Sequence, residues 1–374
     1  MKEISLYIHI PFCKQKCFYC DFPSYARKDD LMEEYVDALN KEIIDKCRDY
    51  KIKSMFIGGG TPSYLTENTL KKLMDTIQKI DFKEGAEKSI ECNPGTVSKE
   101  KFEIMKIGGI NRLSFGLQTT KPSLLKSIGR IHSYEEFKRN YELAREVGFN
   151  NINVDMMFGL PNQSVEDWVS SLQEVIELEP EHISAYSLII EEGTPFYSMY
   201  NKNLLSLPSE EEEREMYHKG RELLLANGYH QYEISNYAKN NRECVHNEVY
   251  WKCEEYIGVG ASSSSYVNNK RIKNIDDLRE YIERSNRNES VIEEEVDNSE
   301  KDNMEEFMFM GLRMTEGISE AEFKRRFGIN IDSVYENVIE GNIKKGLLIR
   351  KSGRIYLSAE GIELSNVVMS DMII

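Results

Sequence analysis

Short apolar runs alternate with longer amphipathic stretches over the first half of the chain. The apolar runs are rich in β-branched and aromatic residues and predict strands at Leu6–Ile10, Ser54–Ile57, Ser89–Cys92, Arg112–Leu117, Asn151–Phe158 and His182–Ile189. The stretches between them have the helical period and predict helices at Leu31–Arg48, Glu67–Ile80, Lys99–Met105, Tyr134–Val147 and Val165–Leu178. This alternation predicts βαβ units and a parallel sheet.

Glycine and polar residues follow several of the predicted strands. They are Gly58-Gly59-Gly60-Thr61-Pro62, Asn93-Pro94-Gly95, Gln118 and Gly159-Leu160-Pro161. Ligand sites of parallel α/β folds gather at these strand ends. Six βαβ units fit either an open doubly wound sheet or a partial barrel. Polar residues at four strand ends favour one shared site at a barrel mouth, so the predicted fold is α/β with a partial (β/α)6 barrel.

The pattern changes at about residue 270. Residues 271–302 are rich in Glu, Asn and Ser and predict an acidic linker or edge segment between a barrel unit at 1–270 and a small domain at 303–374. That domain has three predicted helices and a hairpin: Asn303–Met314, Ser319–Phe327, Ile331–Lys345, and Leu347–Arg350 with Arg354–Leu357. This order is typical of a winged-helix-like α+β domain.

Composition and charge exclude several classes of protein. The chain has 374 residues, of which 40% are apolar and 30% charged, as in an ordinary globular protein. Its net charge of -16 repels polyphosphate, so we expect no nucleic-acid partner and a docking or lid role for the C-terminal module. The N-terminus does not have the pattern of a signal peptide, and no apolar stretch reaches the roughly 20 residues of a membrane span, which predicts a cytoplasmic protein.

Three of the seven cysteines form a C-x3-C-x2-C motif at Cys13, Cys17 and Cys20. Three thiolates on one loop can hold three irons of a [4Fe-4S] cubane and leave the fourth iron open to an exchangeable ligand. Zinc bound by the same thiolates and His9 is one alternative, and inert buried thiols are another. The chain has no second cysteine knuckle for zinc, and three clustered cysteines are unusual for a core, so the cluster is the favoured interpretation. We expect the remaining cysteines in the core.

The cysteine motif and the glycine-rich run Gly58–Pro62 together resemble the radical SAM superfamily. The resemblance implies that S-adenosylmethionine chelates the open iron through its amino and carboxylate groups. An electron donor for the cluster is implied as well. Glycines after the strand let the backbone approach the ligand without a Cβ in the way.

Further motifs occur in a fixed order along the chain. They are Tyr7-Ile8-His9-Ile10-Pro11-Phe12-Cys13, Glu91-Cys92-Asn93-Pro94, Ser114-Phe115-Gly116-Leu117-Gln118, Gly129-Arg130-Ile131-His132 and Asp155-Met156-Met157-Phe158-Gly159-Leu160-Pro161. Together they resemble the family of oxygen-independent coproporphyrinogen III oxidase, HemN, and its relative HemW. The resemblance runs from residue 4 to about residue 270, and the tail resembles the C-terminal domain of the same family.

The resemblance implies two groups of binding residues. Tyr7, Gly59 and Glu91 would contact the cluster-bound S-adenosylmethionine. Positions that serve a second S-adenosylmethionine in the oxidase are matched by Tyr19, Gly60, Thr61, Gln118, Arg130 and Asp155. A purely structural alternative is that Gln118 and Asp155 cap strand ends and that Arg130 forms a surface ion pair.

Two features favour a heme chaperone over an oxidase. The oxidase motif has a further cysteine two residues past the third one, where this chain has Phe22. His246-Asn247-Glu248-Val249-Tyr250-Trp251 reproduces the H-N-x-x-Y-W motif of HemW. The resemblance therefore implies a protein that binds heme, passes it to acceptor proteins and lacks the oxidase's decarboxylation. The alternatives are the oxidative decarboxylase and a DNA-binding regulator, which the overall charge disfavours.

The H-N-x-x-Y-W motif suits heme on chemical grounds. His246 can ligate iron, and Tyr250 and Trp251 offer flat aromatic surface to a porphyrin. The structural alternative is a buried histidine with two core aromatics. We assign no catalytic residue, and the open iron also allows a homodimer whose assembly responds to the cluster.

Overall fold

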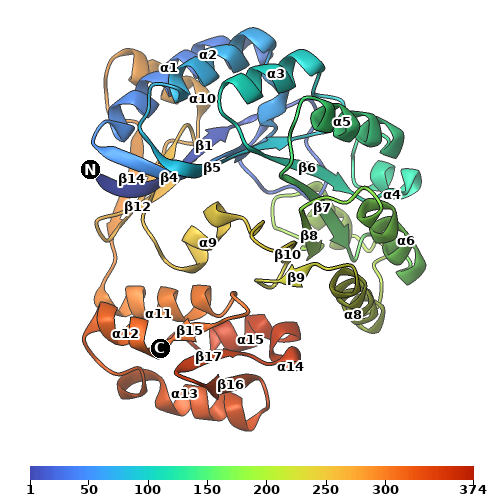
Figure 1. Cartoon of the computed structure of the whole chain (residues 1–374), viewed down its shortest axis with the longest axis vertical. Helices are drawn as coiled ribbons and strands as arrows, with labels where there is room; N and C mark the ends of the chain where they lie inside the picture. The colour runs from blue at the N-terminus through green and yellow to red at the C-terminus, as the bar shows by residue number, and fades with distance from the viewer.

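An arc of parallel strands with helices on its outer side forms the main body of the protein (Figure 1). The computed structural model describes residues 1–374. Six parallel strands pair in chain order: β1 (Lys2–Ile10), β4 (Tyr50–Gly59), β5 (Phe82–Cys92), β6 (Arg112–Gln118), β7 (Ile152–Phe158) and β8 (His182–Ser187). This confirms the predicted partial (β/α)6 barrel.

The outer helices cover the apolar face of the arc. They are α1 (Met32–Cys47), α2 (Glu67–Ile77), α3 (Lys99–Ile107), α4 (Pro122–Ser127), α5 (Tyr134–Glu146) and α6 (Val165–Ile176). Serine and threonine side chains cap α2, α3, α5 and α6 by accepting a backbone N–H of the first turn. In β6 the odd-numbered residues Leu113, Phe115 and Leu117 belong to the core, because alternate side chains of a strand point to opposite faces. The even-numbered residues of β6 therefore face the lumen of the arc.

The sheet continues beyond both ends of the arc. On the β1 side lie β11 (Tyr256–Val259), parallel to β1, and then the antiparallel strands β12 (Ser264–Val267), β13 (Lys270–Asn274) and β14 (Ile292–Asp297). Beside β8 lie β10 (Asn236–Ala238) and β9 (His230–Gln231), which follow α7 (Pro195–Tyr200) and α8 (Glu210–Ala226). Between β10 and β11 the chain forms α9 (Val245–Trp251). Since β10 and β11 lie at opposite ends of the arc, α9 lies on its open side.

Residues 271–302, expected as an acidic linker or edge segment, contain regular structure. They include α10 (Leu278–Asn286) and the edge strand β14, and all but the first residue of β14 are exposed. Lys270 on β13 pairs with Glu295 on β14. The acidic side chains keep this edge in water, which protects an edge strand from pairing with another chain.

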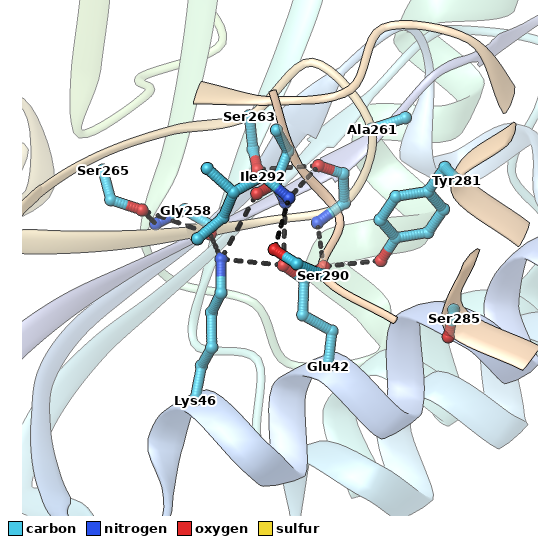
Figure 2. A network of polar contacts seen from close by, with 12 residues as sticks. Glu42, Lys46, Gly258, Ala261, Ser263, Ser265, Tyr281, Ser285, Ser290 and Ile292 are labelled. Atoms are coloured by element: carbon cyan, nitrogen blue, oxygen red, sulfur yellow. Dashed lines mark hydrogen bonds and ion pairs between the residues drawn. The ribbon is translucent and has the colours of Figure 1, made fainter. Parts of the chain in front are cut away.

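A buried carboxylate ties this extension to the barrel (Figure 2). Glu42 on α1 accepts hydrogen bonds from the Gly260 N–H at 2.8 Å, the Tyr281 hydroxyl at 2.5 Å and the Asn274 amide at 2.7 Å. Lys46, one turn along α1, forms an ion pair with Glu42 at 2.8 Å. The loop after β11, β13 and α10 thus share one acceptor on α1.

The C-terminal residues form a unit with its own apolar core. Its elements are α11 (Glu300–Gly311), β15 (Ile318–Ser319), α12 (Glu320–Phe327), α13 (Asp332–Lys344), β16 (Leu348–Lys351), β17 (Arg354–Leu357), α14 (Ala359–Glu363) and α15 (Ser365–Ser370). The three predicted helices and the hairpin occur in the predicted order, and β15 joins the hairpin as a third strand. Helices α14 and α15 were not predicted. Nowhere in the chain is a helix both long and apolar enough to cross a membrane.

Candidate functional site

The cysteine motif lies on a loop that two short strands close. Phe12 and Cys13 form β2 (Phe12–Cys13), which pairs with β3 (Tyr25–Ala26), and the Tyr25 N–H donates to the Pro11 carbonyl at 2.7 Å. Cys13, Cys17 and Cys20 from this loop line one cavity of about 130 Å³ at the carboxyl ends of β4, β5 and β6. The structure thus brings all three predicted cluster ligands together.

The turn after α4 holds the cysteine loop in place. The Phe18 N–H donates to the Ile128 carbonyl at 3.1 Å, and the Gln15 amide donates to the Gly129 carbonyl at 3.0 Å. Gly129 has φ +79°, and a Cβ there would lie 3.1 Å from the Phe18 ring. A glycine is required at this turn, because any side chain would displace the loop that carries the thiols.

The backbone at Gly60 passes close to the cysteine loop. A Cβ on Gly60 would lie 3.0 Å from Cys13 Sγ and 2.8 Å from the Phe12 carbonyl oxygen, so the glycine is needed for this approach. Burial raises the pKa of Cys13, and it raises the pKa of Cys20 to about 11. Both thiols must therefore lose a proton when they bind iron. No three His, Cys, Asp or Glu side chains are grouped to hold a single metal ion.

The residues predicted to contact S-adenosylmethionine lie around the same cavity. Its lining includes Tyr19, Gly59, Gly60, Thr61, Glu91, Gln118, Arg130 and Asp155. Tyr7 lines the adjoining cavity, and its hydroxyl lies 3.0 Å from Nδ1 of His9. The His9 ring is held from its other side by the Pro23 carbonyl at 2.9 Å, which gives this strand residue a structural role. All nine predicted positions therefore face one continuous space.

Two carboxyl groups face this space. The Gly59 N–H donates to Glu91 Oε2 at 3.1 Å. Burial and the nearby Asp155 raise the pKa of Glu91 to about 8. Asp155 accepts from the Asn153 amide at 2.7 Å and from the Ser114 hydroxyl at 3.3 Å, while burial raises its pKa as well.

Arg130 and Gln118 are fixed by neutral partners. Arg130 donates to the Asn93 side-chain oxygen and to the Gly116 carbonyl, both at 2.9 Å, and it forms no ion pair within the chain. Gln118 ends β6 with φ +73° and accepts from the Tyr186 hydroxyl at 2.8 Å. Arg130 is thus oriented beside the cysteine loop without a direct ion pair to a carboxylate.

A larger cavity of about 610 Å³ extends from the cysteine loop along the lumen to α9. The two cavities share Tyr19, Cys20, Phe22, Gly59, Glu91, Ser114, Asp155 and Tyr186. His246 and Tyr250 line the larger cavity. The structure does not bring Trp251 to it, because the Trp251 ring packs under the Arg313 guanidinium at 4.3 Å.

His246 is almost wholly buried, and both ring nitrogens have partners. Nδ1 lies 3.1 Å from the Ser54 hydroxyl and Nε2 lies 3.0 Å from the Tyr250 hydroxyl, while the ring stacks on Phe56 at 5.6 Å. Burial, with a smaller effect of Lys53, lowers the pKa of His246 to about 3. The ring is therefore neutral at physiological pH, which is the form that ligates metals.

The lumen also contains polar residues that we did not predict. Arg112, Asn153, His182, Ser184 and Asn236 line the larger cavity and are buried. The sequence pattern could have revealed Arg112, Asn153, His182 and Ser184, because polar residues recur at every second position of their strands. In β6, for example, Ser114 and Gln118 lie on the same face as Arg112. A half-apolar strand with a charged residue at an alternate position indicates a polar lumen.

Comparison with protein families agrees with these features. The family model described as Radical SAM superfamily matches residues 7–175, and the HemN C-terminal domain model matches residues 298–364. The heme chaperone HemW of Bacillus subtilis (strain 168) is 40% identical over 97% of this chain and 97% of its own length. The heme chaperone HemW of Escherichia coli (strain K12) is 34% identical over 96% of this chain and 97% of its own length.

One solved structure shares the fold over the whole chain. It is the coproporphyrinogen III oxidase (HemN) of Escherichia coli, described as a radical SAM enzyme, with a TM-score of 0.87 and 22% sequence identity. The similarity covers 100% of this chain and 90% of that chain. At this identity the likeness shows a common fold.

Proposed function

The chain belongs to the HemW family of radical SAM proteins, and we propose that it binds heme, a [4Fe-4S] cluster and S-adenosylmethionine and transfers heme to acceptor proteins. One observation carries the proposal: the cavity of the three cysteines opens into a larger cavity that the H-N-x-x-Y-W helix lines. A cluster on the loop and a porphyrin in the lumen would therefore be neighbours.

The residues present suit the cluster and its ligand. Cys13, Cys17 and Cys20 would hold three irons of the cubane in the cavity of about 130 Å³ that they line. When bound, the cluster supplies an electron and an open coordination site. Tyr7, Gly59 and Glu91 would hold the S-adenosylmethionine at that site, with Glu91 accepting from ribose hydroxyls.

The residues proposed for a second S-adenosylmethionine line the cavity of the three cysteines. They are Tyr19, Gly60, Thr61, Gln118, Arg130 and Asp155. Arg130 has no carboxylate partner in the chain, and its planar guanidinium suits the carboxylate of the methionine moiety. Equilibrium dialysis with labelled S-adenosylmethionine should give two equivalents per reconstituted chain, and one equivalent for Arg130→Gln.

We propose that His246 is the heme-iron ligand and that Tyr250 covers it in the heme-free state. The Ser54 hydroxyl would keep Nδ1 protonated and orient the ring, as second-shell partners of metal-bound histidines do. Nε2 would exchange its hydrogen bond to Tyr250 for the iron. Trp251 would then support α9 from the C-terminal side and not stack on the porphyrin.

The test pairs two variants with opposite expected effects. His246→Ala should abolish or shift the heme Soret band, because the nitrogen ligand is gone. Tyr250→Phe keeps the aromatic ring and removes the competing hydroxyl, so it should strengthen heme binding severalfold. Unchanged spectra and affinities in both variants would refute His246 as the ligand.

A second experiment distinguishes the chaperone from the oxidase. The reconstituted protein, loaded with heme under anaerobic conditions, should reduce its Soret signal as an apo-acceptor gains one. Coproporphyrinogen III with S-adenosylmethionine and a reductant should yield no protoporphyrinogen IX. Light scattering of the same protein with and without the cluster measures its mass and so tests the homodimer. Reduction of the cluster by chemical donors tests whether the protein needs an electron donor.

A further inference from the structure

Arg112 is a buried cation in the floor of the larger cavity. It begins β6, its side chain points into the lumen, and only 2% of its surface is exposed. A buried guanidinium is costly unless it is paired and hydrogen-bonded. The hydrogen-bond partners of Arg112 therefore show whether its guanidinium is satisfied by the chain itself or has room for a ligand.

The hydrogen bonds of Arg112 use one side of the guanidinium. Nη1 donates to the Asn151 side-chain oxygen at 3.1 Å and to the Arg242 carbonyl at 3.3 Å. Nε is buried without any partner, and Nη2 makes no hydrogen bond within the chain. Nε and Nη2 form the edge of the guanidinium that accommodates the two oxygens of a carboxylate.

The nearby acids are occupied elsewhere. Glu87 on β5 accepts from the Val245 and His246 N–H groups, each at 3.2 Å, and thereby holds the start of α9. Asp155 accepts from Asn153 and Ser114. Neither carboxylate reaches ion-pair distance of Arg112, so the charge of Arg112 has no direct counter-ion in the chain.

The remaining floor of the cavity is neutral and polar. The nitrogens of His182 are paired with the Asn153 oxygen at 2.6 Å and the Tyr232 hydroxyl at 2.9 Å, and burial lowers the pKa of His182 well below its usual value. Asn236 Oδ1 is buried without a partner beside the same cavity. The uncharged histidine adds no second cation, so Arg112 is the positive group of this floor.

We propose that Arg112 anchors a carboxylate of the ligand in the lumen, through the free Nε–Nη2 edge of its guanidinium. This inference rests on the proposed function and deepens it: the ligand carboxylate is a propionate of heme. The porphyrin would then be held at its central iron, near α9, and at a propionate on its edge, at the floor of the cavity. A cavity of about 610 Å³ lies in the range of small-molecule sites.

The test compares two probes that differ only at their propionate groups. They are iron protoporphyrin IX and its dimethyl ester, which has the same iron and macrocycle and no carboxylate. The cluster-reconstituted full chain should bind the free acid about 10- to 100-fold more tightly than the ester, as expected for a charged hydrogen-bonded pair. Arg112→Gln should weaken binding of the free acid by a similar factor and leave binding of the ester unchanged.

Two variants control for structural damage. Arg145→Gln removes a partly buried arginine that is paired with Glu181 outside the cavity, and it should affect neither probe. Arg112→Lys keeps the positive charge but lacks the two-donor edge of the guanidinium, so it should lose part of the preference for the free acid over the ester. If Arg112→Gln fails to fold, the comparison of the two probes on the unaltered chain and on Arg112→Lys still decides the matter.

The outcomes separate this inference from the function on which it rests. Equal affinity of the unaltered chain for acid and ester, with a normal Soret band, would overturn the anchoring role and leave the heme chaperone intact. If Arg112→Gln still prefers the free acid, another residue binds the carboxylate, and the anchoring role of Arg112 is overturned as well. Failure of the unaltered chain to bind either probe would refute the proposed function itself.

Discussion

The environment of Glu91 favours its protonated form in the cluster-free protein. Its pKa is about 8 in the folded chain, against about 4.5 when unfolded, because burial and Asp155 disfavour the charge. Between these values the folded state binds more protons than the unfolded state, so the free energy of unfolding falls as pH rises. The contribution is complete below pH 4.5 and is lost by about pH 8, and solvent in the cavity limits it to about 1–3 kcal/mol.

Glu91→Gln should flatten this part of the pH profile. The amide keeps an oxygen for the Gly59 N–H and has no proton to lose. Urea unfolding of the cluster-free chain between pH 5 and pH 8 measures the slope. Glu84→Gln, an exposed change on the same strand, is the control. A Glu91→Gln slope equal to that of the control would contradict the raised pKa.

Individual residues were predictable where their chemistry depends on type and spacing. The three cysteines and Gly60 lie together as predicted, since a short motif fixes them on one loop. The hydrogen bond between His246 and Tyr250 could not be read from the motif, although the two residues are one helical turn apart. Whether such a pair faces a ligand or each other depends on packing around α9.

At the scale of elements, Glu42 joins segments that are far apart in sequence. Glu42→Ala would leave the Tyr281 hydroxyl, the Gly260 N–H and the Asn274 amide without their acceptor in a buried place. We expect a loss of about 2–4 kcal/mol in the free energy of unfolding. Hydrogen exchange should increase most in α10 and β13, because they depend on this acceptor.

Tyr281→Phe is the matched control for this prediction. It removes one hydrogen bond of the network and should cost about 1 kcal/mol. Equal destabilisation by Tyr281→Phe and Glu42→Ala, measured by urea unfolding at neutral pH, would mean that the carboxylate does not hold the extension.

Elements with a clear period were predicted, and elements with mixed patterns were not. All six parallel strands were predicted, although β1, β4 and β5 begin four to seven residues before their predicted starts. The five predicted helices between them follow their ranges closely, and the short helix α4 was not predicted. Helix α10 and strand β14 lie in a polar segment, where few apolar positions report the period. These elements are stabilised by contacts with residues far away in the sequence, such as Glu42, and a local sequence pattern does not reveal such contacts.

At the scale of the whole molecule, Arg313 connects the C-terminal unit to the barrel. Its carbonyl accepts the Ile234 N–H at 3.0 Å, its guanidinium lies 3.8 Å from the buried Glu233 carboxylate, and it stacks over Trp251. Arg313→Ala would remove the cation beside Glu233 and expose the Trp251 ring. We expect a loss of about 1–3 kcal/mol and a red shift of Trp251 emission.

The chain has two tryptophans, so the measurement is best made in a Trp168→Phe background. Arg287→Ala is the control, because Arg287 forms only exposed ion pairs, with Glu283 and Glu289 at the C-terminal end of α10. A spectrum unchanged by Arg313→Ala would show that the contact between the units does not depend on this side chain.

The arrangement of the whole sheet was only partly predictable. Alternating strands and helices determine the arc, because each helix returns the chain to the neighbouring strand. No helix between neighbouring strands explains the pairing of β11 with β1. This pairing depends on α9, which carries the chain from β10 across the open side of the arc to β11.

This pairing has a consequence for biosynthesis. Ser5 at the start of the chain pairs with Tyr256, so β1 keeps an unpaired edge until most of the protein has left the ribosome. At about 5–20 residues per second, the delay is on the order of 10–50 seconds. During that interval the cysteine loop emerges without its complete surroundings. Cluster assembly is thus expected after translation, and a truncated nascent chain ending before β11 should be sensitive to oxidation of its thiols.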